Sequence, residues 1–291
     1  MIKHWIEAMR LRTLPVSLAG VVMAWGFNFI NHNFNLTPAI LCLLFALLAQ
    51  ISSNFANEYY DFKSGLDRKG RDGHRRGVTE GDITPRAMKM ATYGTLALAC
   101  AVGCSLIYYG GWWLLPMGIV IALGAMAYSA GPYPLSRHGL GEVAVLFFFG
   151  IIPVTLTYYV QSLEWNIQVL FASISMGLMG ANVLIVNNYR DHDDDKNVGK
   201  RTLAVIFGRK VVANLYLFNG FIAVALMAGM WSLMPVWSWA IPVLYLVAHT
   251  AIWIQLNVRT GSRLNPLLGM TAMAMAAYSL LFAIVASLAQ N

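Results

Sequence analysis

Long runs of apolar residues alternate with short polar segments along the whole chain of 291 residues. Each run holds about 20 mostly apolar residues, which is the length a helix needs to cross the hydrocarbon core of a bilayer. Nine runs can be marked, at roughly residues 14–30, 38–58, 87–109, 112–130, 141–161, 167–188, 208–231, 236–257 and 265–288. The pattern predicts an all-α, polytopic membrane bundle of about nine transmembrane helices.

The positions of the basic residues test this division independently. If successive helices run in opposite directions, all 20 Lys and Arg residues fall on the side of the membrane that holds the N-terminus. The opposite loops hold none, and of the 13 acidic residues only Glu164 lies there. By the positive-inside rule, the charged side is cytoplasmic. We therefore expect a cytoplasmic N-terminus, an external C-terminus, and an active site at the cytoplasmic ends of the helices.

The composition supports a lipid environment. Hydrophobic residues make up 58% of the chain and charged residues 11%, whereas soluble domains carry about 25% charged residues. The net charge of +7 therefore reflects topology and an anionic substrate, not nucleic-acid binding. Cys42, Cys100 and Cys104 all fall inside predicted spans, and we expect them to be buried structural residues.

Polar residues form a stripe at the cytoplasmic end of the second span and another at the end of the sixth. Steps of three and four residues place the members of each stripe on one side of a helix. The first stripe is Gln50, Asn54, Asn57 and Asp61, and the second is Asn188, Asp191 and Asp195. Ionisable groups at such positions are costly and usually face a cavity or a partner. We expect both stripes to do so, and Asp193 and Asp194, which lie off the stripe, to be solvated.

The pattern Asn-x-Tyr-x-Asp occurs twice, at residues 57–61 and 187–191, four spans apart. This suggests a parallel internal repeat whose two acidic faces converge. Carboxylate and amide oxygens suit Mg²⁺, which proteins typically hold with one or two carboxylates plus substrate phosphates. Lys and Arg residues follow each acidic segment and would neutralise the remaining phosphate charge. The pattern therefore favours a site for Mg²⁺ and a diphosphate.

These residues resemble the two Asp-rich motifs of the UbiA-type intramembrane prenyltransferases. The matching segments are Asn57-Glu58-x-x-Asp61 with Asp67, Arg190-Asp191 through Asp195 to Gly199-Lys200-x-Thr202-Leu203, Arg10 to Pro15, Tyr128-Ser129, and Gly139 to Glu142. The match runs from about residue 9 to 208, and it is closest to the branch that prenylates 1,4-dihydroxy-2-naphthoate in menaquinone synthesis. Three departures are Glu58, where the family usually has Asp; Asp67, which follows Asp61 by six residues where many relatives have the third acid at the place of Gly65; and Pro132, where relatives with other acceptors have Lys.

The resemblance implies a single prenyltransferase domain over residues 1–291, in a bacterial cytoplasmic (inner) membrane. It would transfer a polyprenyl group from an allylic polyprenyl diphosphate to 1,4-dihydroxy-2-naphthoate with Mg²⁺, giving demethylmenaquinone, CO₂ and diphosphate. The implied metal ligands are Asn57, Glu58, Asp61, Asp67, Asn188, Asp191 and Asp195, with Asp61, Asp191 and Asp195 catalytic. The implied diphosphate-binding residues are Arg10, Arg12, Lys63, Arg71, Arg76 and Lys200. Tyr128, Arg137 and Glu142 are candidates for binding the acceptor, and no obligate protein partner is expected.

Two alternatives stay open. Motif spacing does not exclude another aromatic acceptor, such as 4-hydroxybenzoate or homogentisate. A lipid or small-molecule transporter is the alternative from a different class, and it would place ionisable groups near the bilayer midplane, often within inverted repeats. Here the acidic residues lie at the ends of the predicted spans and the repeat is parallel, which favours the enzyme.

Overall fold

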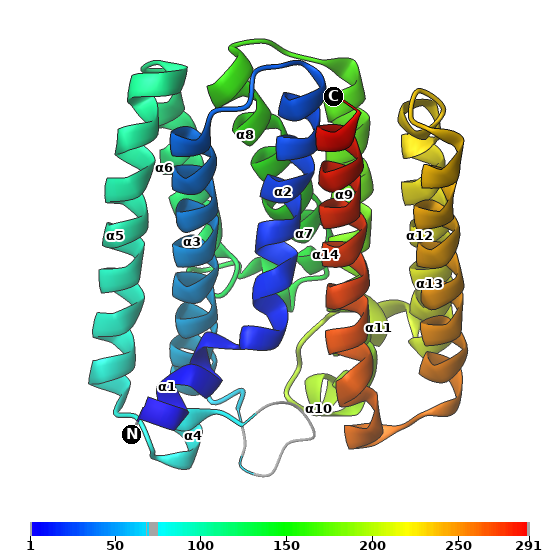
Figure 1. Ribbon diagram of the computed structural model, residues 1–291. Coiled ribbons are helices and arrows are strands. Elements are labelled where there is room, and N and C mark those ends of the chain that lie inside the picture. The colour runs from blue at the N-terminus through cyan, green and yellow to red at the C-terminus, as the bar shows by residue number, and fades with distance from the viewer. Residues whose placement is uncertain (1, 68, 70–74, 290–291) are drawn as a thin grey trace.

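The chain folds into a bundle of long helices, and the computed structural model describes residues 2–67, 69 and 75–289 (Figure 1). Over these residues it contains helices and turns but no strand. The helices that run between the two ends of the bundle are α2 (Leu14–Ile30), α3 (Leu36–Lys63), α5 (Pro85–Gly110), α6 (Leu114–Ala127), α7 (Gly141–Val145) continued by η3 (Leu146–Ile151) and α8 (Ile152–Ser162), α9 (Ile167–Arg190), α12 (Arg209–Trp231), α13 (Ala240–Val258) and α14 (Asn265–Leu288). Short helices are α1 (Ile2–Met9), η1 (Leu11–Thr13), α4 (Gly77–Glu80), η2 (Leu135–Arg137), α10 (His192–Asn197), α11 (Leu203–Phe207), η4 (Val236–Trp239) and η5 (Gly261–Leu264). The prediction of an all-α polytopic bundle is confirmed.

Eight of the described helices are long and apolar enough to cross a membrane, and α6 is a shorter apolar helix. Its 14 residues extend about 21 Å, less than the ~30 Å of a typical hydrocarbon core. The predicted span 112–130 is therefore too long at both ends. After Tyr128 the chain turns, because Gly131 adopts φ +93° and Pro132 and Pro134 lack the N–H groups that would continue a helix.

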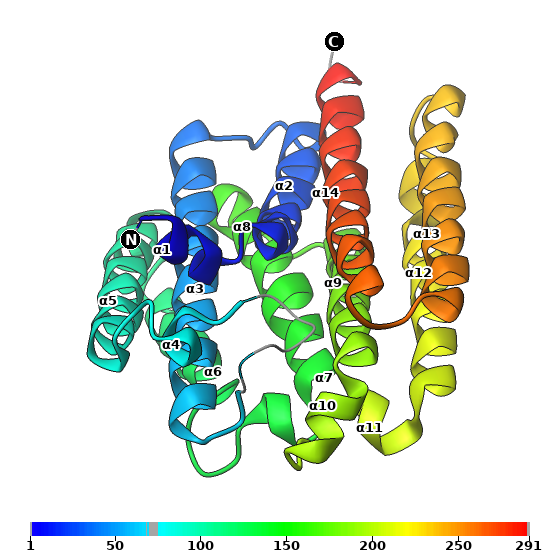
Figure 2. The same cartoon turned by 90° about the horizontal axis from the view of Figure 1, so that it is seen from below.

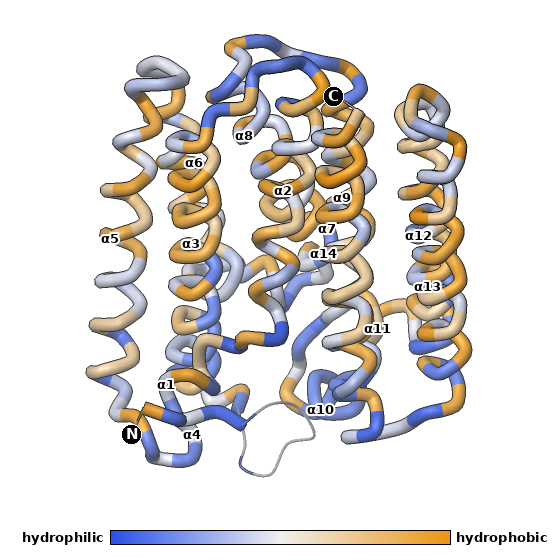
Figure 3. The backbone as a smooth tube through the Cα atoms, viewed as in Figure 1, coloured by the Kyte–Doolittle hydropathy of each residue, from blue (hydrophilic) through white to orange (hydrophobic). Residues whose placement is uncertain are grey.

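Polar segments gather at the two ends of the bundle, with apolar helix between them (Figure 3). α3, α9 and α13 end, and α5, α12 and α14 begin, at the end where α1 lies (Figure 1). The basic segments therefore share that end, as the alternation of charge predicted. At the opposite end, Asn35 and Asn166 cap α3 and α9 by accepting the N–H of Thr37 (3.1 Å) and Gln168 (2.8 Å). Such caps satisfy N–H groups that the lipid interior cannot.

α9 is the most enclosed of the spanning helices described, because 72% of an apolar 18-residue stretch of it is buried inside the bundle. Small residues permit this burial, because a methyl group added at Gly150 of η3 would collide with the backbone of Gly177 on α9. Polar contacts also join α9 to α12: Ser175 Oγ donates to a carbonyl of α12 (2.8 Å), and Asn182 Nδ2 donates to the carbonyl of Tyr216 (3.1 Å). Close backbone packing and hydrogen bonds hold helices together where the hydrophobic effect is absent.

The α7–η3–α8 segment changes from α- to π-helical and back partway along its length. Pro153 lacks an N–H group, so the carbonyl of Phe149 has no α-helical donor there. That carbonyl faces α2, where a methyl group added at Gly20 would lie 3.0 Å from its oxygen. The π-helical turn therefore rests against α2 at a glycine.

Cys42 is buried as predicted, but the prediction for Cys100 and Cys104 is wrong, because both are exposed on α5. Apolar spans contain lipid-facing positions as well as core positions, and hydropathy does not separate the two.

α12 and α13 lie beyond α9 and α14, on the side away from α5 and α6 (Figure 2).

Candidate active site

A cavity of about 630 Å³ lies among α2, α3, α5, α6, α7–η3–α8 and α9. Most of its wall is apolar, and its polar residues collect where α3 and α9 end. They include Arg10, Gln50, Asn54, Asn57, Asp61, Arg76, Tyr128, Glu142, Asn187, Asn188, Asp191, Asp195 and Lys200. The whole first stripe and the whole second stripe thus face one cavity, as expected from their spacing.

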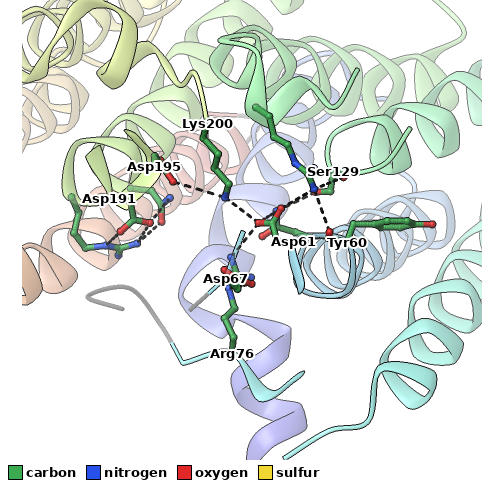
Figure 4. A network of polar contacts seen from close by, with 12 residues as sticks. Tyr60, Asp61, Asp67, Arg76, Ser129, Asp191, Asp195 and Lys200 are labelled. Atoms are coloured by element: carbon green, nitrogen blue, oxygen red, sulfur yellow. Dashed lines mark hydrogen bonds and ion pairs between the residues drawn. The ribbon is translucent and has the colours of Figure 1, made fainter. Parts of the chain in front are cut away.

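Asp61 lies within 4 Å of three cationic side chains, which are Arg76, Arg137 and Lys200 (Figure 4). Its Oδ1 accepts from Arg137 Nη2 (3.1 Å), and its Oδ2 accepts from Lys200 Nζ (3.1 Å) and Asn57 Nδ2 (3.2 Å). Arg76 Nη2 lies 3.8 Å from Oδ2. The positive charge gathered around this buried carboxylate suits a polyanionic ligand.

Lys200 joins the two acidic segments. Its Nζ lies 3.1 Å from Asp61 on α3 and 3.8 Å from Asp195 on α10 (Figure 4). The chain turns back towards the cavity just before it, because Gly199 adopts a left-handed conformation with φ +75°. Both motif segments therefore converge on one ammonium group.

Asp191 is held by its neighbour Arg190. The Nε and Nη2 atoms of Arg190 donate to the two carboxylate oxygens at 2.7 and 2.9 Å. The same guanidinium donates to Asn187 Oδ1 (2.8 Å) and to Asn265 Oδ1 at the start of α14 (2.9 Å). Arg190 is buried and fixes the direction of Asp191. Arg190 was recognised from the sequence as part of the second motif, but no role was predicted for it.

The two Asn-x-Tyr-x-Asp segments share a contact as well as a pattern. Asn57 Nδ2 donates to Asp61 at 3.2 Å, and Asn187 Nδ2 donates to Asp191 at 3.5 Å. Asn187 is therefore the counterpart of Asn57, although Asn188 was the predicted ligand. Sequence analysis missed Asn187, and the repeat is the signal that could have identified it.

Asn188 makes a different contact. Its Nδ2 donates to Glu142 Oε1 (2.9 Å), and both side chains line the cavity beside Tyr128. Glu142 is 6% exposed, and its Oε2 has no hydrogen-bond partner among the described residues. A buried carboxylate oxygen that faces a cavity in this way is ready to accept a hydrogen bond from a ligand hydroxyl.

Two further cations face the polar end. Arg10 adopts a left-handed conformation (φ +54°) between α1 and η1, and its Nη2 donates to Asn57 Oδ1. Asn54 Nδ2 donates to the carbonyl of Met9 (2.9 Å), which fastens α1 to α3 beside this turn. Arg76 is 5% exposed, and its Nε lies 3.4 Å from Asp67 Oδ2. Arg76 lines the cavity and Asp67 does not, so this ion pair connects Asp67 to the site.

Five of the predicted residues that the structure describes do not line the cavity, and these are Arg12, Glu58, Lys63, Asp67 and Arg137. Glu58 is one position beyond Asn57 and thus about 100° around the helix. Its Oε1 accepts the N–H of Val78 at 3.0 Å, so this carboxylate anchors α4. Lys63 and Arg12 are exposed, and Arg137 contacts Asp61 from the η2 side. Arg71 lies outside the described residues.

No three Asp, Glu, His or Cys side chains among the described residues form a group that could hold one metal ion. The oxygen donors instead stand in two sets, one on α3 and one on α9–α10. Such a donor set fits Mg²⁺, because this ion is usually bound by one or two carboxylates together with substrate phosphates.

Asp193 lies outside the site and is exposed; its hydrogen bonds with His192 and Arg209 lower the pKa of its carboxyl.

Residues 13–280 match the profile of the UbiA prenyltransferase family. The chain is similar to a 1,4-dihydroxy-2-naphthoate octaprenyltransferase of Haemophilus influenzae, with 35% identity over 220 residues, 71% of this chain and 70% of that protein. A protein of the same name from Escherichia coli is 33% identical over 244 residues, 81% of this chain and 79% of that one. The solved structure of a UbiA homolog from Archaeoglobus fulgidus bound to GPP and Mg²⁺ matches with a TM-score of 0.72 over 98% of this chain and 99% of that chain. At 19% identity this last likeness concerns the fold.

Proposed function

The chain belongs to the UbiA prenyltransferase family, and we propose that it transfers a polyprenyl group from an allylic polyprenyl diphosphate to 1,4-dihydroxy-2-naphthoate. The products are CO₂, diphosphate and demethylmenaquinone, the last in its quinol form. The naphthoate acceptor is supported by the names of the relatives from H. influenzae and E. coli. In this proposal the whole chain is one prenyltransferase domain.

The observation that carries the proposal is the convergence of Asp61 and Asp195 on Lys200 at the polar end of an apolar cavity. A diphosphate head needs cations and metal ligands, whereas an isoprenoid tail needs an apolar wall, and this cavity has both. The charged residues of the site lie where α3 and α9 end. A transporter would instead place such groups near the bilayer midplane.

We assign the oxygen donors for Mg²⁺ to Asp61, Asp191 and Asp195, with Asn57 and Asn187 beside them. When bound, Mg²⁺ neutralises the charge that develops on the departing diphosphate. Arg190 keeps Asp191 pointed at the cavity through its two parallel hydrogen bonds. Glu58 is left out of the ligand set because its carboxylate faces α4.

The basic residues Arg10, Arg76 and Lys200 bind the diphosphate oxygens in this mechanism. They matter most as the allylic C–O bond breaks, because negative charge then grows on the leaving oxygen. The electron pair of that bond leaves with the diphosphate, and the ring carbon that bears the carboxylate attacks the allylic cation. The ring becomes aromatic again as the carboxylate departs as CO₂. The apolar cavity wall keeps water from the cation meanwhile.

The acceptor would bind beside Glu142 and Tyr128. The free Oε2 of Glu142 accepts a hydrogen bond from a ring hydroxyl, which orients the ring and makes it more electron-rich. Asn188 holds the other carboxylate oxygen in place at 2.9 Å. Arg137, which was a candidate acceptor contact, instead supports Asp61 in this assignment.

We place the site on the cytoplasmic side of a bacterial inner membrane. The basic segments gather at the end of the bundle that holds the site, and the positive-inside rule assigns that end to the cytoplasm. The diphosphate donor is then supplied from the side where water-soluble substrates are made, while its tail stays in lipid.

The test is prenyl transfer by the purified protein in detergent, with 1,4-dihydroxy-2-naphthoate, a series of allylic diphosphates, and either Mg²⁺ or EDTA. We expect product that requires Mg²⁺ and is lost in Asp191→Asn. Asp193→Asn is the matched control, because that carboxylate is exposed in the same segment. Product with 4-hydroxybenzoate or homogentisate alone would replace the acceptor and keep the mechanism. No transfer to any acceptor by folded protein would refute the proposal.

A further inference from the structure

Each Asn-x-Tyr-x-Asp segment contains the same chain of side-chain contacts, which runs from an arginine through the asparagine to the aspartate. In the first segment Arg10 donates to Asn57 Oδ1, and Asn57 Nδ2 donates to Asp61 Oδ2 at 3.2 Å. Arg10 comes from outside α3, and the chain beside it is fastened because Asn54 Nδ2 donates to the Met9 carbonyl (2.9 Å). The first aspartate is therefore oriented from an element outside its own helix.

The second segment repeats these contacts with an arginine from its own helix. Arg190 Nη2 donates to Asn187 Oδ1 at 2.8 Å, and Asn187 Nδ2 donates to Asp191 Oδ2 at 3.5 Å. Arg190 lies next to Asp191 in the chain, so by itself it brings no support from another element. That support comes from Asn265, whose Oδ1 accepts from Arg190 Nη1 at 2.9 Å.

The guanidinium of Arg190 is planar and carries five N–H donors in a fixed fork. Its Nε and Nη2 atoms meet the two oxygens of Asp191 along one edge, at 2.7 and 2.9 Å. Among the described residues, Asn265 is the acceptor that its Nη1 meets. The side chain of Arg190 is only 5% exposed, so removal of Asn265 Oδ1 leaves Nη1 buried with little water to replace that acceptor. The guanidinium then tilts towards a new acceptor, and Asp191 moves with it.

Asn265 is a fixed point because the chain around it is tightly packed. It is the first residue of α14, and Pro266, the next residue, favours the start of a helix there. Leu264 and Leu267 are buried in the main core cluster, and η5 packs on α9. No candidate site residue was predicted beyond Lys200, so this contact is a product of the tertiary structure alone.

We propose that Asn265 is a positioning residue of the site: it fixes the guanidinium of Arg190, which holds Asp191 in the orientation that binds Mg²⁺. Asn265 does not line the cavity, so it acts through Arg190 and touches neither substrate. The α13–α14 hairpin thereby becomes part of the second acidic segment, as the turn at Arg10 is part of the first. The inference rests on the proposed function, because it takes Asp191 as an oxygen donor for Mg²⁺.

Metal binding by variants of Asn265 tests the proposal. Mn²⁺ takes the same kinds of oxygen ligand as Mg²⁺, and its binding to purified protein with inorganic diphosphate is followed by electron paramagnetic resonance. Asn265→Leu removes the acceptor at similar volume, whereas Asn265→Asp keeps an oxygen at the same place. We expect Asn265→Leu to raise the Kd for Mn²⁺ about tenfold or more, and Asn265→Asp to bind Mn²⁺ as the wild type does. An unchanged Kd in Asn265→Leu, or equal losses in both variants, would overturn the proposal.

Two further variants separate the lost acceptor from other effects. Asn265→Ala only shortens the side chain and should weaken Mn²⁺ binding as Asn265→Leu does, so the result does not depend on how Leu packs. Asn257→Leu is the matched control, because Asn257 is exposed near the end of α13 and its Nδ2 donates to the carbonyl of Trp253 in the same helix (2.8 Å). It should stay within about twofold of the wild-type Kd. A tenfold loss in this control would refute the assignment to Asn265.

A double-mutant cycle shows whether Asn265 acts through Arg190. Arg190→Gln removes the guanidinium, and adding Asn265→Leu to it should then change the Kd for Mn²⁺ by less than about twofold, because the shared contact is already lost. A second full loss on top of Arg190→Gln would mean that Asn265 acts on the fold by another route, and the proposal would be wrong.

Prenyl transfer gives the last readout. In Asn265→Leu the Mg²⁺ concentration for half-maximal rate should rise by the same factor as the Kd for Mn²⁺, while the KM for 1,4-dihydroxy-2-naphthoate stays unchanged. A changed acceptor KM with an unchanged Mg²⁺ requirement would contradict the proposal. If wild-type protein binds Mn²⁺ with diphosphate but transfers no prenyl group, the proposed function fails instead, and the Mn²⁺ measurements still test the role of Asn265.

Discussion

Replacing Lys200 by Met removes the positive charge that lies between the two acidic segments. Lys200 Nζ stands 3.1 Å from Asp61 and 3.8 Å from Asp195, and its side chain is only 12% exposed. Met keeps a long unbranched side chain without the ammonium group, so the packing of the loop changes little. The variant therefore isolates the charge from the shape.

The expected loss in kcat follows from the role of that charge. A preorganised donor aimed at charge that develops in the transition state is worth about 2.7–4 kcal/mol, or 10²–10³ in kcat. Arg76 and Arg137 share the neutralisation of Asp61, so we expect the lower end, about 10². Binding of Mg²⁺ should move in the opposite direction and become tighter, because a competing cation has left the carboxylates.

The assay is chromatographic detection of prenylated acceptor at saturating donor, together with a Mg²⁺ titration of the rate. Lys196→Met is the matched control, because Lys196 is exposed on α10 and does not line the cavity. If Lys200→Met keeps kcat within about twofold of wild type, then Lys200 is only a structural counter-ion and the reasoning is wrong. An equal loss in Lys196→Met would show that general surface charge, not this contact, sets the rate.

Three further predictions use other parts of the molecule. Gly150→Ala should lower the free energy of unfolding of the detergent-solubilised protein by about 1–3 kcal/mol or more, because the added methyl group meets the backbone of Gly177. Gly94→Ala, with open space around the added methyl group, should leave the free energy of unfolding unchanged or raise it slightly. Glu58→Gln should leave the Mg²⁺ dependence of the rate unchanged, since this carboxylate bonds a backbone N–H of α4; a raised Mg²⁺ requirement would return it to the ligand set. Glu142→Gln should lower kcat at saturating donor while the donor KM stays the same, and a changed donor KM with unchanged kcat would contradict its placement beside the acceptor.

Several features of the site were predictable because they depend on helical spacing alone. Asn57 and Asp61 lie four positions apart on α3, so they share a face whatever surrounds the helix, and the same holds for Asn187 and Asp191 on α9. Spacing failed for Glu58. Its neighbours in the sequence suggested a ligand, but its direction is set by α4, whose Val78 N–H it accepts on a different face of α3.

By itself, the sequence determined the class of the protein, the nine apolar segments, the gathering of charge at one end, and the two acidic stripes. These follow from composition and local periodicity, which depend on neighbours a few positions apart. Tertiary packing alone decided that Lys200 bridges Asp61 and Asp195, that Arg190 holds Asp191, and that Cys100 and Cys104 are exposed. The physical reason is that an apolar face serves equally well against lipid and against another helix. Only the arrangement of all the helices selects which face becomes the wall of the cavity.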